Sequence, residues 1–556
     1  MSASPSRALP CVVQVGFAGS RRLFDLPAGG GDQQRALEQQ VEERLGQTLA
    51  SLPKDLGLAG HHFLCGISQI AAGADLIFTR ACERLQIPQR IFLPQPRDVY
   101  LEAVGSSGHP DFAPQARLDA EQILTHKHII QERVVSDADD RATRFEDCNR
   151  EILRESNVVV CLIGAGTENG RGGTAELLTL AQERGKTVLE IRVVITKGQA
   201  ELLPTWHGLK SFRPPVLPQA VEGVTLQLDS QQSADAGVLP SVSQFCGAVK
   251  QHASAEAKRH NELFSRAALV VVGTHVLATL CATVVLAAHG AREAEAAPDR
   301  QTGFWILGLL ALEFALLACG FMMHRWLHHA KSQKSWAISR LLAEINRSVT
   351  ALGNLHIHLA YLFGLRLPRE LSPLFHTINI LHLRSTRPFA HEPWEALRDA
   401  YLVNRFDDSD PRKGQIRYFT DRCKTESNRL RFANALFITC SSLAILATAT
   451  KLVLQLLLLR GRLPAQPEAF WPKVLGTLAV FLPTLAVGAL SWAAAKEYKA
   501  RLQAFDAMRR FLQTQEDYLK KAVSSREFHL LVEETESNLL GETVEWYFRR
   551  TVIGVP

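Results

Sequence analysis

The chain has 556 residues and a net charge of +6, with Lys and Arg gathered beside apolar segments instead of along one basic face. This length leaves room for two or three domains, and the modest charge does not favour a nucleic-acid partner. Ten cysteines occur without CxxC pairs, which argues against a disulfide framework or a zinc site. The N-terminal sequence lacks the pattern of a signal peptide, so we expect the front of the chain to stay in the cytosol.

The first 250 residues alternate between short apolar strands and helical segments. This alternation is typical of a parallel sheet covered by helices on both faces, with a ligand crevice at the carboxyl ends of its strands. We therefore expect an α/β Rossmann-like domain over residues 1–250. Strands are predicted at residues 11–16, 62–65, 90–93, 157–163 and 187–194, with helices after the first, second and fourth.

Three loops that contain glycine follow the first, second and fourth of these strands. Because glycine has no Cβ, loop amides can approach a phosphate, and the helix that follows offers its positive N-terminal end. A single such loop can also be explained by the geometry of a strand-to-helix turn, but three at one sheet edge favour a ligand site. The candidate ligand-binding residues are Gly16, Gly19, Ser20, Arg21, Gly66, Ser68, Gln69, Gly73, Asp75, Gly164, Gly172, Gly173, Thr174 and Glu176.

Asp75 and Glu176 each have a second interpretation, because an acid in the first turn of a helix stabilises the helix dipole without touching a ligand. The segment 97–155 is rich in charge and is predicted to form helices over the crevice or a partner surface. We interpret its acids, among them Asp140 and Asp147, as a solvated face.

Four apolar segments after residue 250 are long enough to cross a bilayer as helices. They occur as two pairs, in residues 267–289 and 303–323 and in residues 432–450 and 474–495. Two tryptophans, 21 residues apart, mark the two ends of the second segment of each pair: Trp305 and Trp326, and Trp471 and Trp492. This spacing in a helix matches the thickness of the bilayer core. We expect an all-α membrane domain made of two-span units at 251–350 and 411–556, joined by a helical connector at 351–410.

Lys and Arg residues precede the first and third spans and follow the second and fourth. By the positive-inside rule both termini are expected in the cytosol. Glu313 and Lys451 are candidate pore residues, because a charge in hydrocarbon must face protein or water. Alternatively, Glu313 forms a helix-packing hydrogen bond and Lys451 extends to the membrane surface.

The glycine loops resemble those of the SLOG superfamily, a Rossmann-like fold shared with the lonely-guy cytokinin-activating enzymes. The matching residues are GxxGSR at 16–21, the run from Gly66 to Asp75 and GRGGTAE at 170–176. The resemblance implies a nucleotide ligand, first of the ADP-ribose type and second a cyclic oligonucleotide. In the lonely-guy motif the acid follows the threonine by three residues; here Glu176 follows Thr174 by two, which favours binding over hydrolysis.

The paired spans and the flanking motifs at 401–405, 415–418 and 545–546 resemble the SLATT family of prokaryotic conflict systems. Together the two resemblances imply a homo-oligomeric effector in the inner membrane that answers a nucleotide second messenger made by a separately encoded synthase. Its expected action is to permeabilise or depolarise the membrane during anti-phage defence, with growth arrest or cell death.

Two other functions are compatible with the sequence. One is a membrane-tethered nucleotide N-glycosidase with Glu176 as the catalytic acid and Arg21 as a phosphate clamp. The other is a constitutive channel or scaffold whose sheet domain drives assembly. We expect no metal or other cofactor, because the histidine clusters at 324–329 and 356–358 lie beside membrane segments.

Overall fold

The computed structural model describes residues 6–25, 31–103, 111–164, 171–227, 239–292, 300–329, 332–353, 367–386, 393–406, 414–460 and 470–552, with four single residues between 354 and 366. The chain divides into two compact units. The sheet unit comprises Met1–Val249 and Leu352–His391, and the helical unit comprises Lys250–Ala351 and Glu392–Pro556. The predicted combination of an α/β Rossmann-like domain and an all-α domain with four apolar helices is confirmed.

A seven-stranded sheet in the order β5-β4-β3-β2-β6-β7-β8 forms the centre of the sheet unit. Neighbouring strands are parallel except for the β7–β8 hairpin. The five predicted strands are present, whereas β5 and β8 were not predicted. The strands are β2 (Cys11–Gly19), β3 (His62–Ser68), β4 (Gln89–Leu93), β5 (Ile129–Val134), β6 (Val158–Ile163), β7 (Thr187–Thr196) and β8 (Gln199–His207); β1 (Ser6–Ala8) and β9 (Thr225–Gln227) form a small second sheet.

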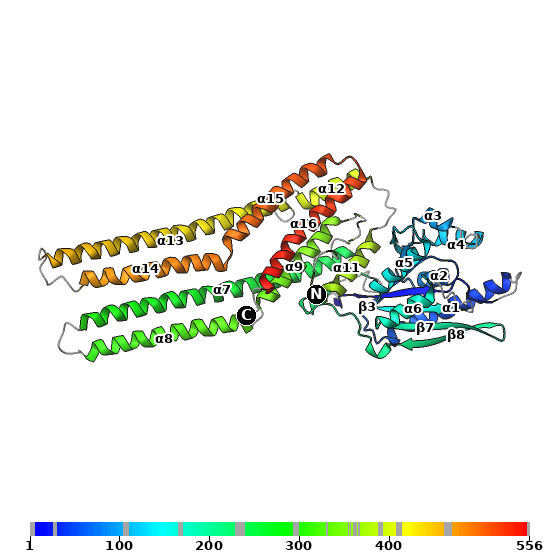
Figure 1. Ribbon diagram of the computed structural model, residues 1–556, viewed down its shortest axis with the longest axis horizontal. Helices are drawn as coiled ribbons and strands as arrows, with labels where there is room; N and C mark the ends of the chain where they lie inside the picture. Colours follow the sequence, from blue (N-terminus) through cyan, green and yellow to red (C-terminus); the bar gives the residue numbers. More distant parts are fainter. Residues whose placement is uncertain are drawn as a thin grey trace, which may run out of the picture. The chain divides into compact units, whose positions relative to one another are not determined.

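Helices cover both faces of this sheet, because successive strand side chains point in opposite directions (Figure 1). In β2, Val13, Val15 and Phe17 pack with α1 (Gly31–Asp55) and α2 (Ala74–Arg84). On the other face, Ala18 packs in a cluster with α5 (Arg141–Glu155) and α6 (Thr174–Glu183). Two short helices, α3 (Arg97–Leu101) and α4 (Pro114–Ile123), contribute to a third apolar cluster beside β4.

The segment expected as the first part of a connector belongs to the sheet unit instead. Helix α11 (Ser372–Ser385) packs on the α5 face of the sheet, where Ile380 and Leu383 join Val12 in one apolar cluster. The backbone amide of Val12 donates a hydrogen bond of 3.1 Å to Thr377 Oγ1. Residues 377–383 of α11 are all buried, so this part of the helix is enclosed on every side, and the burial holds the chain to the sheet between the two span pairs.

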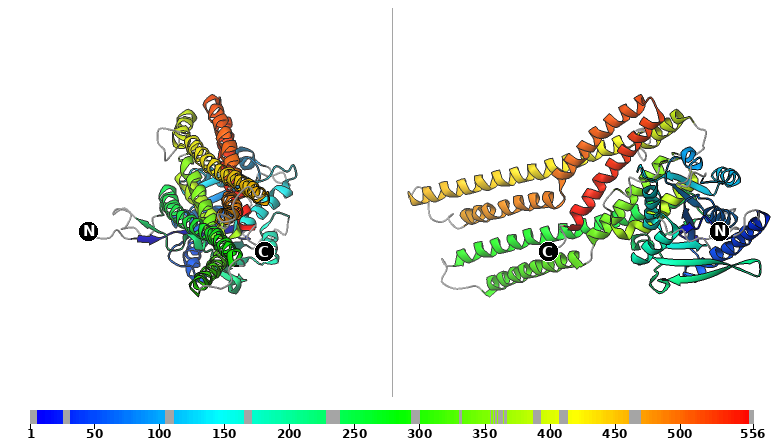
Figure 2. Two further views of the ribbon diagram at one scale, coloured as in Figure 1. Left: turned by 90° about the vertical axis from the view of Figure 1, so that its left-hand side faces the viewer. Right: turned by 45° about the vertical axis from the view of Figure 1, so that its right-hand side comes forward.

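The helical unit contains the same succession of three helices twice. In the first copy the long helix α7 (Val242–Arg292) is followed by the apolar α8 (Arg300–His329) and by α9 (Ser332–Leu352). In the second, α13 (Gln415–Leu459) is followed by α14 (Phe470–Ala495) and α15 (Tyr498–Lys521). Figure 2 shows α13 and α14 side by side. Each of α7, α8, α13 and α14 contains a segment long and apolar enough to cross a membrane.

Glycines allow close approach between apolar helices. A Cβ on Gly320 of α8 would lie 2.7 Å from Thr274 Oγ1 of α7. A Cβ on Gly488 of α14 would lie 3.1 Å from a methyl group of Val276, also on α7. Small residues serve this purpose in helix pairs within membranes, where there is no hydrophobic driving force between helices.

Outside the apolar segments, a buried ion pair joins α12 (Trp394–Phe406) to α16 (Ser525–Val552). The Arg405 guanidinium and the Tyr401 hydroxyl each donate a 2.7 Å hydrogen bond to a carboxylate oxygen of Glu536. Trp546 packs edge-on against Trp336, with ring centroids 4.9 Å apart. Residues of the flanking motifs that were singled out from the sequence therefore hold the helices of this unit together.

Candidate functional site: a crevice at the carboxyl edge of the sheet

A polar cavity of about 590 Å³ lies at the carboxyl end of β2 in the sheet unit. Strand β2 pairs with β3 on one side and with β6 on the other, so the chain changes direction across the sheet at this point. Such switch points are where open parallel sheets bind ligands. The crevice is lined by Phe17, Ala18, Gly19, Arg21, Gln69, Ala71, Asp75, Asp111, Asp140, Arg141, Ala142, Phe145, Asn149, Arg171, Gly172, Gly173 and Thr174.

Half of the predicted ligand-binding residues line this crevice and half do not. All three predicted loops contribute to the lining: the residues are Gly19, Arg21, Gln69, Asp75, Gly172, Gly173 and Thr174. The remaining predicted residues lie behind the lining and are Gly16, Ser20, Gly66, Ser68, Gly73, Gly164 and Glu176.

The glycines behind the lining make room for the protein's own backbone. Gly73 has a positive φ of 91°, and a Cβ there would lie 2.3 Å from the carbonyl oxygen of Arg21. A Cβ on Gly164 would lie 2.4 Å from the carbonyl oxygen of Arg22. Both glycines thus let the loop after β2 fit between its neighbours, and the position of Arg21 depends on them.

Gly16 and Gly66 serve the packing of helices on the sheet. A Cβ on Gly16 would lie 2.1 Å from Ser156 Oγ, at the end of α5, and one on Gly66 would lie 3.2 Å from the ring of Phe78 on α2. The two predicted serines are buried in backbone contacts: Ser20 Oγ accepts a hydrogen bond of 3.1 Å from the Gly164 amide, and Ser68 Oγ donates one of 2.6 Å to the Gln69 carbonyl.

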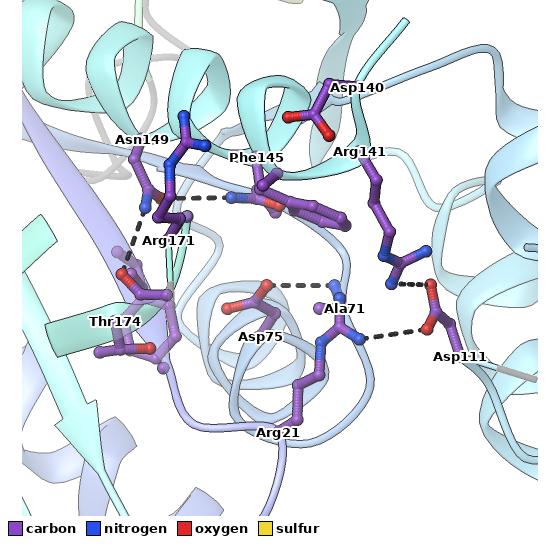
Figure 3. A pocket seen from close by; sticks show the side chains of 17 residues that line it. Arg21, Ala71, Asp75, Asp111, Asp140, Arg141, Phe145, Asn149, Arg171 and Thr174 are labelled. Atoms are coloured by element: carbon purple, nitrogen blue, oxygen red, sulfur yellow. Dashed lines mark hydrogen bonds and ion pairs between the residues drawn. The ribbon is translucent and has the colours of Figure 1, made fainter. Parts of the chain in front are cut away.

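Two arginines on one wall of the crevice share a carboxylate. Asp111 lies 3.3 Å from Arg21 Nη1 and 2.5 Å from Arg141 Nη2, and its side chain is 6% exposed (Figure 3). Both guanidinium groups also lie over the ring of Phe145, 5.3 Å and 5.2 Å from its centroid. The two cations are therefore held in place by an acid and a ring, and one positive charge of the pair remains uncompensated by Asp111.

Asp75 forms the base of the crevice. Its Oδ2 accepts a hydrogen bond of 3.0 Å from the Ala71 amide, so it closes the loop ahead of α2, as the second interpretation from the sequence expected. The side chain is nevertheless part of the lining. Burial raises the pKa of Asp75 from 3.8 to about 7, although the Ala71 hydrogen bond and the Arg21 charge act to lower it. This carboxyl therefore changes charge near neutral pH.

Glu176 turns back on its own loop. Its carboxylate accepts a hydrogen bond from the Gly172 amide, which satisfies a donor ahead of α6. This contact corresponds to the helix-terminus interpretation of Glu176. The carboxylate is directed at the protein backbone and is absent from the crevice lining, whereas Arg21, the expected phosphate clamp of an N-glycosidase, is part of it.

Helix α5 provides a wall of the crevice, in the segment that was predicted to form helices over the crevice or a partner surface. None of its residues was among the candidates, and its acids were interpreted as a solvated face, whereas Asp140 lines the crevice together with Asp111 and Arg141. Arg141, Phe145 and Asn149 follow one another at intervals of four residues, so they lie on one face of α5. That spacing, with an aromatic residue in an otherwise charged stretch, is the sequence signal that identifies this wall.

Asn149 links two of the predicted loops. Its Nδ2 donates to the Gly173 carbonyl at 3.3 Å, and its Oδ1 accepts from Gln69 Nε2 at 3.3 Å. Beyond Arg141 and Phe145 lies a second cavity of about 230 Å³, which both residues also line. The buried hydroxyl of Tyr100 borders it and has no hydrogen-bond partner within the described ranges.

The two candidate pore residues differ in their exposure and lie on different helices. Glu313 on α8 is partly exposed, whereas Lys451 on α13 is exposed and its ammonium group lies beside Gly476 of α14. In the part of the chain that the structure describes, no ion pair joins them. Whether Glu313 lines a pore, or Lys451 extends to the membrane surface, stays a prediction.

The crevice combines features that together suit a phosphate bound to a planar group. Guanidinium groups and the N-terminal ends of α2 and α6 favour an anion, and the Phe145 ring offers a flat apolar surface. Comparisons of the chain with protein-family models, with curated proteins and with solved structures found no match.

Proposed function

We propose that this chain is a membrane effector whose sheet unit binds a nucleotide in the crevice and whose helical unit responds to that binding. The observation that carries the proposal is the pair Arg21 and Arg141, held over Phe145 at the switch point of the sheet. Cations that can bind phosphate therefore lie next to an aromatic ring that can stack on a base.

Helix α5 offers a route from the crevice to the rest of the chain. At its far end the Glu155 carbonyl accepts a hydrogen bond of 2.8 Å from Gln14 Nε2. The same Gln14 amide lies 3.1 Å from His376 Nδ1 on α11. Because α11 lies in the chain between the two span pairs, a shift of α5 on ligand binding would reach the segment that joins both pairs.

Such a response requires the ligand to bind one arrangement of α5 better than another, since equal binding shifts no equilibrium. By resemblance to SLOG sensors the ligand is an ADP-ribose-type nucleotide or, second, a cyclic oligonucleotide. By resemblance to SLATT modules the response is permeabilisation of the inner membrane by a homo-oligomer with cytosolic termini, in defence against phage.

The first test is a thermal-shift screen of the full chain in detergent against ADP-ribose derivatives, cyclic dinucleotides and cyclic trinucleotides. A ligand that prefers the folded state raises the melting temperature by mass action. We expect Arg21→Ala to abolish the shift and Arg154→Ala, an exposed arginine at the far end of α5, to retain it. A shift that survives Arg21→Ala would place the ligand elsewhere, and no shift with any compound would argue against a sensor.

The second test measures ion flux in vesicles that contain the purified chain. We expect flux to depend on the ligand identified above, and His376→Ala to weaken that dependence while the thermal shift remains. Flux without any nucleotide dependence would favour the constitutive channel instead. If Glu313→Gln left flux and its selectivity unchanged, the pore role of Glu313 would be rejected.

A further inference from the structure

At the amino edge of the sheet, opposite the crevice, three potential metal ligands converge. Glu83 lies in the last turn of α2, and His126 and His128 lie in the turn that joins α4 to β5. One ligand atom from each residue lies within 4.8 Å of the other two. Glu83, His126 and His128 are called the Glu83 cluster below.

Backbone hydrogen bonds fix the turn that carries both histidines. The His126 amide donates to the Ile123 carbonyl at 3.0 Å, and the His126 carbonyl accepts from the Ile129 amide at 3.1 Å. The His128 carbonyl accepts a hydrogen bond of 2.8 Å from the Gln89 amide at the start of β4. The two imidazole rings are thus presented from a rigid turn, as a metal site requires.

His128 is 7% exposed, yet within the described residues neither ring nitrogen forms a hydrogen bond of normal geometry. Burial lowers the pKa of His128 to about 4, and this effect is larger than that of the nearby Thr79 backbone, which raises the pKa. A buried imidazole without a partner is costly, because its polar atoms have lost water.

The contact between the other two members also differs from an ordinary hydrogen bond. His126 Nδ1 lies 2.8 Å from Glu83 Oε1, but the directions of the two groups do not suit a hydrogen bond. Two ligands each about 2.0–2.1 Å from one zinc ion lie about 3.3 Å apart in a tetrahedron. A displacement of about half an ångström would therefore let both atoms bind a single ion.

We propose that the Glu83 cluster binds one Zn²⁺ ion through two imidazole nitrogens and one carboxylate oxygen, with water at the fourth position. Nitrogen and oxygen donors in this proportion suit zinc, and three protein ligands leave an open coordination site. Glu83 is more than 40 residues from the two histidines in the sequence, and the expectation of no metal had considered other histidines, at 324–329 and 356–358. This proposal does not depend on the function of the crevice.

The test uses the full chain in detergent, freed of metal by a chelator and titrated with Zn²⁺ by calorimetry. Co²⁺ is added in a parallel titration, because its visible absorption reports imidazole coordination. We expect one Zn²⁺ per chain whose affinity falls at least about tenfold in Glu83→Gln and in His128→Ala. Glu83→Gln is the decisive variant, since it preserves the shape of a partly exposed side chain.

A matched control is His207→Ala. His207 Nε2 also lies 2.8 Å from a carboxylate oxygen, that of Glu190, but no third ligand group joins this pair within the described ranges. We expect its loss to leave the Zn²⁺ affinity unchanged. Binding that is equally strong in Glu83→Gln and His128→Ala would assign the ion to other histidines and overturn the proposal, as would the absence of binding by the parent chain.

Discussion

The carboxylate of Asp111 lies 2.5 Å from the guanidinium group of Arg141, in the place where an anionic ligand would meet that arginine. Under the proposed function, Asp111 would compete with an anionic ligand for Arg141 and for Arg21. We expect Asp111→Asn to strengthen phosphate binding by about tenfold, or about 1.4 kcal/mol, because a negative charge leaves the crevice while the side chain keeps its shape. Calorimetry with the ligand found in the thermal-shift screen would measure this change.

Asp119→Asn is the matched control for that measurement. Asp119 also pairs with an arginine, Arg80 at 3.2 Å, but neither residue lines the crevice. We expect the control to leave phosphate binding unchanged. Weaker binding by Asp111→Asn would mean that Asp111 positions the arginines more than it competes with the ligand.

The pKa of Asp75, about 7, predicts a pH dependence of binding. Below this value the carboxyl is neutral; above it, a negative charge faces the ligand. The affinity for an anion should therefore fall as the pH rises from about 6 to about 8, and Asp75→Asn should remove most of this dependence. Asp55→Asn, an exposed acid at the end of α1, should retain it. An unchanged pH profile in Asp75→Asn would exclude Asp75 as its source.

The same group affects stability. Its pKa in the folded chain lies above the ordinary value of 3.8, so the folded state binds a proton that the unfolded state releases. The contribution of Asp75 to the free energy of unfolding is thus largest below about pH 4 and declines as the pH rises to about 7. The melting temperatures of the parent chain and of Asp75→Asn should therefore become more alike as the pH falls and Asp75 is protonated.

Gly73→Ala should damage the crevice through the backbone. The new Cβ would meet the Arg21 carbonyl oxygen at 2.3 Å in a residue whose φ is positive. We expect a loss of stability above about 3 kcal/mol, from strain and displacement of the loop. Gly185→Ala provides the comparison, because Gly185 also has a positive φ but has nothing within 4 Å of its Cβ position. A cost of about 1 kcal/mol is expected there, and equal melting temperatures would contradict the clash.

Glu155→Gln should destabilise the sheet unit. Burial alone would raise the pKa of Glu155, but the Arg90 guanidinium lowers it to about 2. Arg90 is 0% exposed, so removal of the carboxylate leaves a buried positive charge and costs about 3–5 kcal/mol. The contribution of the pair is lost as the pH falls from about 4.5 to about 2. Glu183→Gln, at the exposed end of α6, should melt like the parent chain.

Periodicity predicted the strands that are buried on both faces, because their apolar runs are continuous. β2 has eight successive buried residues, and β6 has five. β5 was not predicted because only its first three residues are buried and the polar residues Gln131, Glu132 and Arg133 interrupt its apolar run, a result of its position at the edge of the sheet. β8, exposed along much of its length, pairs only with β7 and carries a similarly mixed pattern.

The loops of the crevice were predictable from glycine, whereas its second wall was not. Glycine marks a backbone position, but it does not distinguish room for a ligand from room for the protein: a Cβ on Gly172 would lie 2.4 Å from the Cβ of Phe145, although Gly172 lines the crevice. Arg141 and Asp111 were hidden among many charges, and only the tertiary structure pairs them. Glu83 and His128 are likewise brought together only by the tertiary structure. Glu83 lies at the end of α2, just before β4, and His128 lies just before β5, which pairs with β4 in the sheet.

The return of residues 352–391 to the sheet unit limits how the chain can be threaded through a bilayer. A packed unit lies in one compartment, so the number of crossings between residue 249 and residue 352 must be even. Likewise, the buried pair Arg405–Glu536 joins helices that come before α13 and after α14, so the crossings between them must also be even. Two crossings in each pair satisfy both conditions. The parity of the spans thus follows from packing alone, without any appeal to the distribution of Lys and Arg.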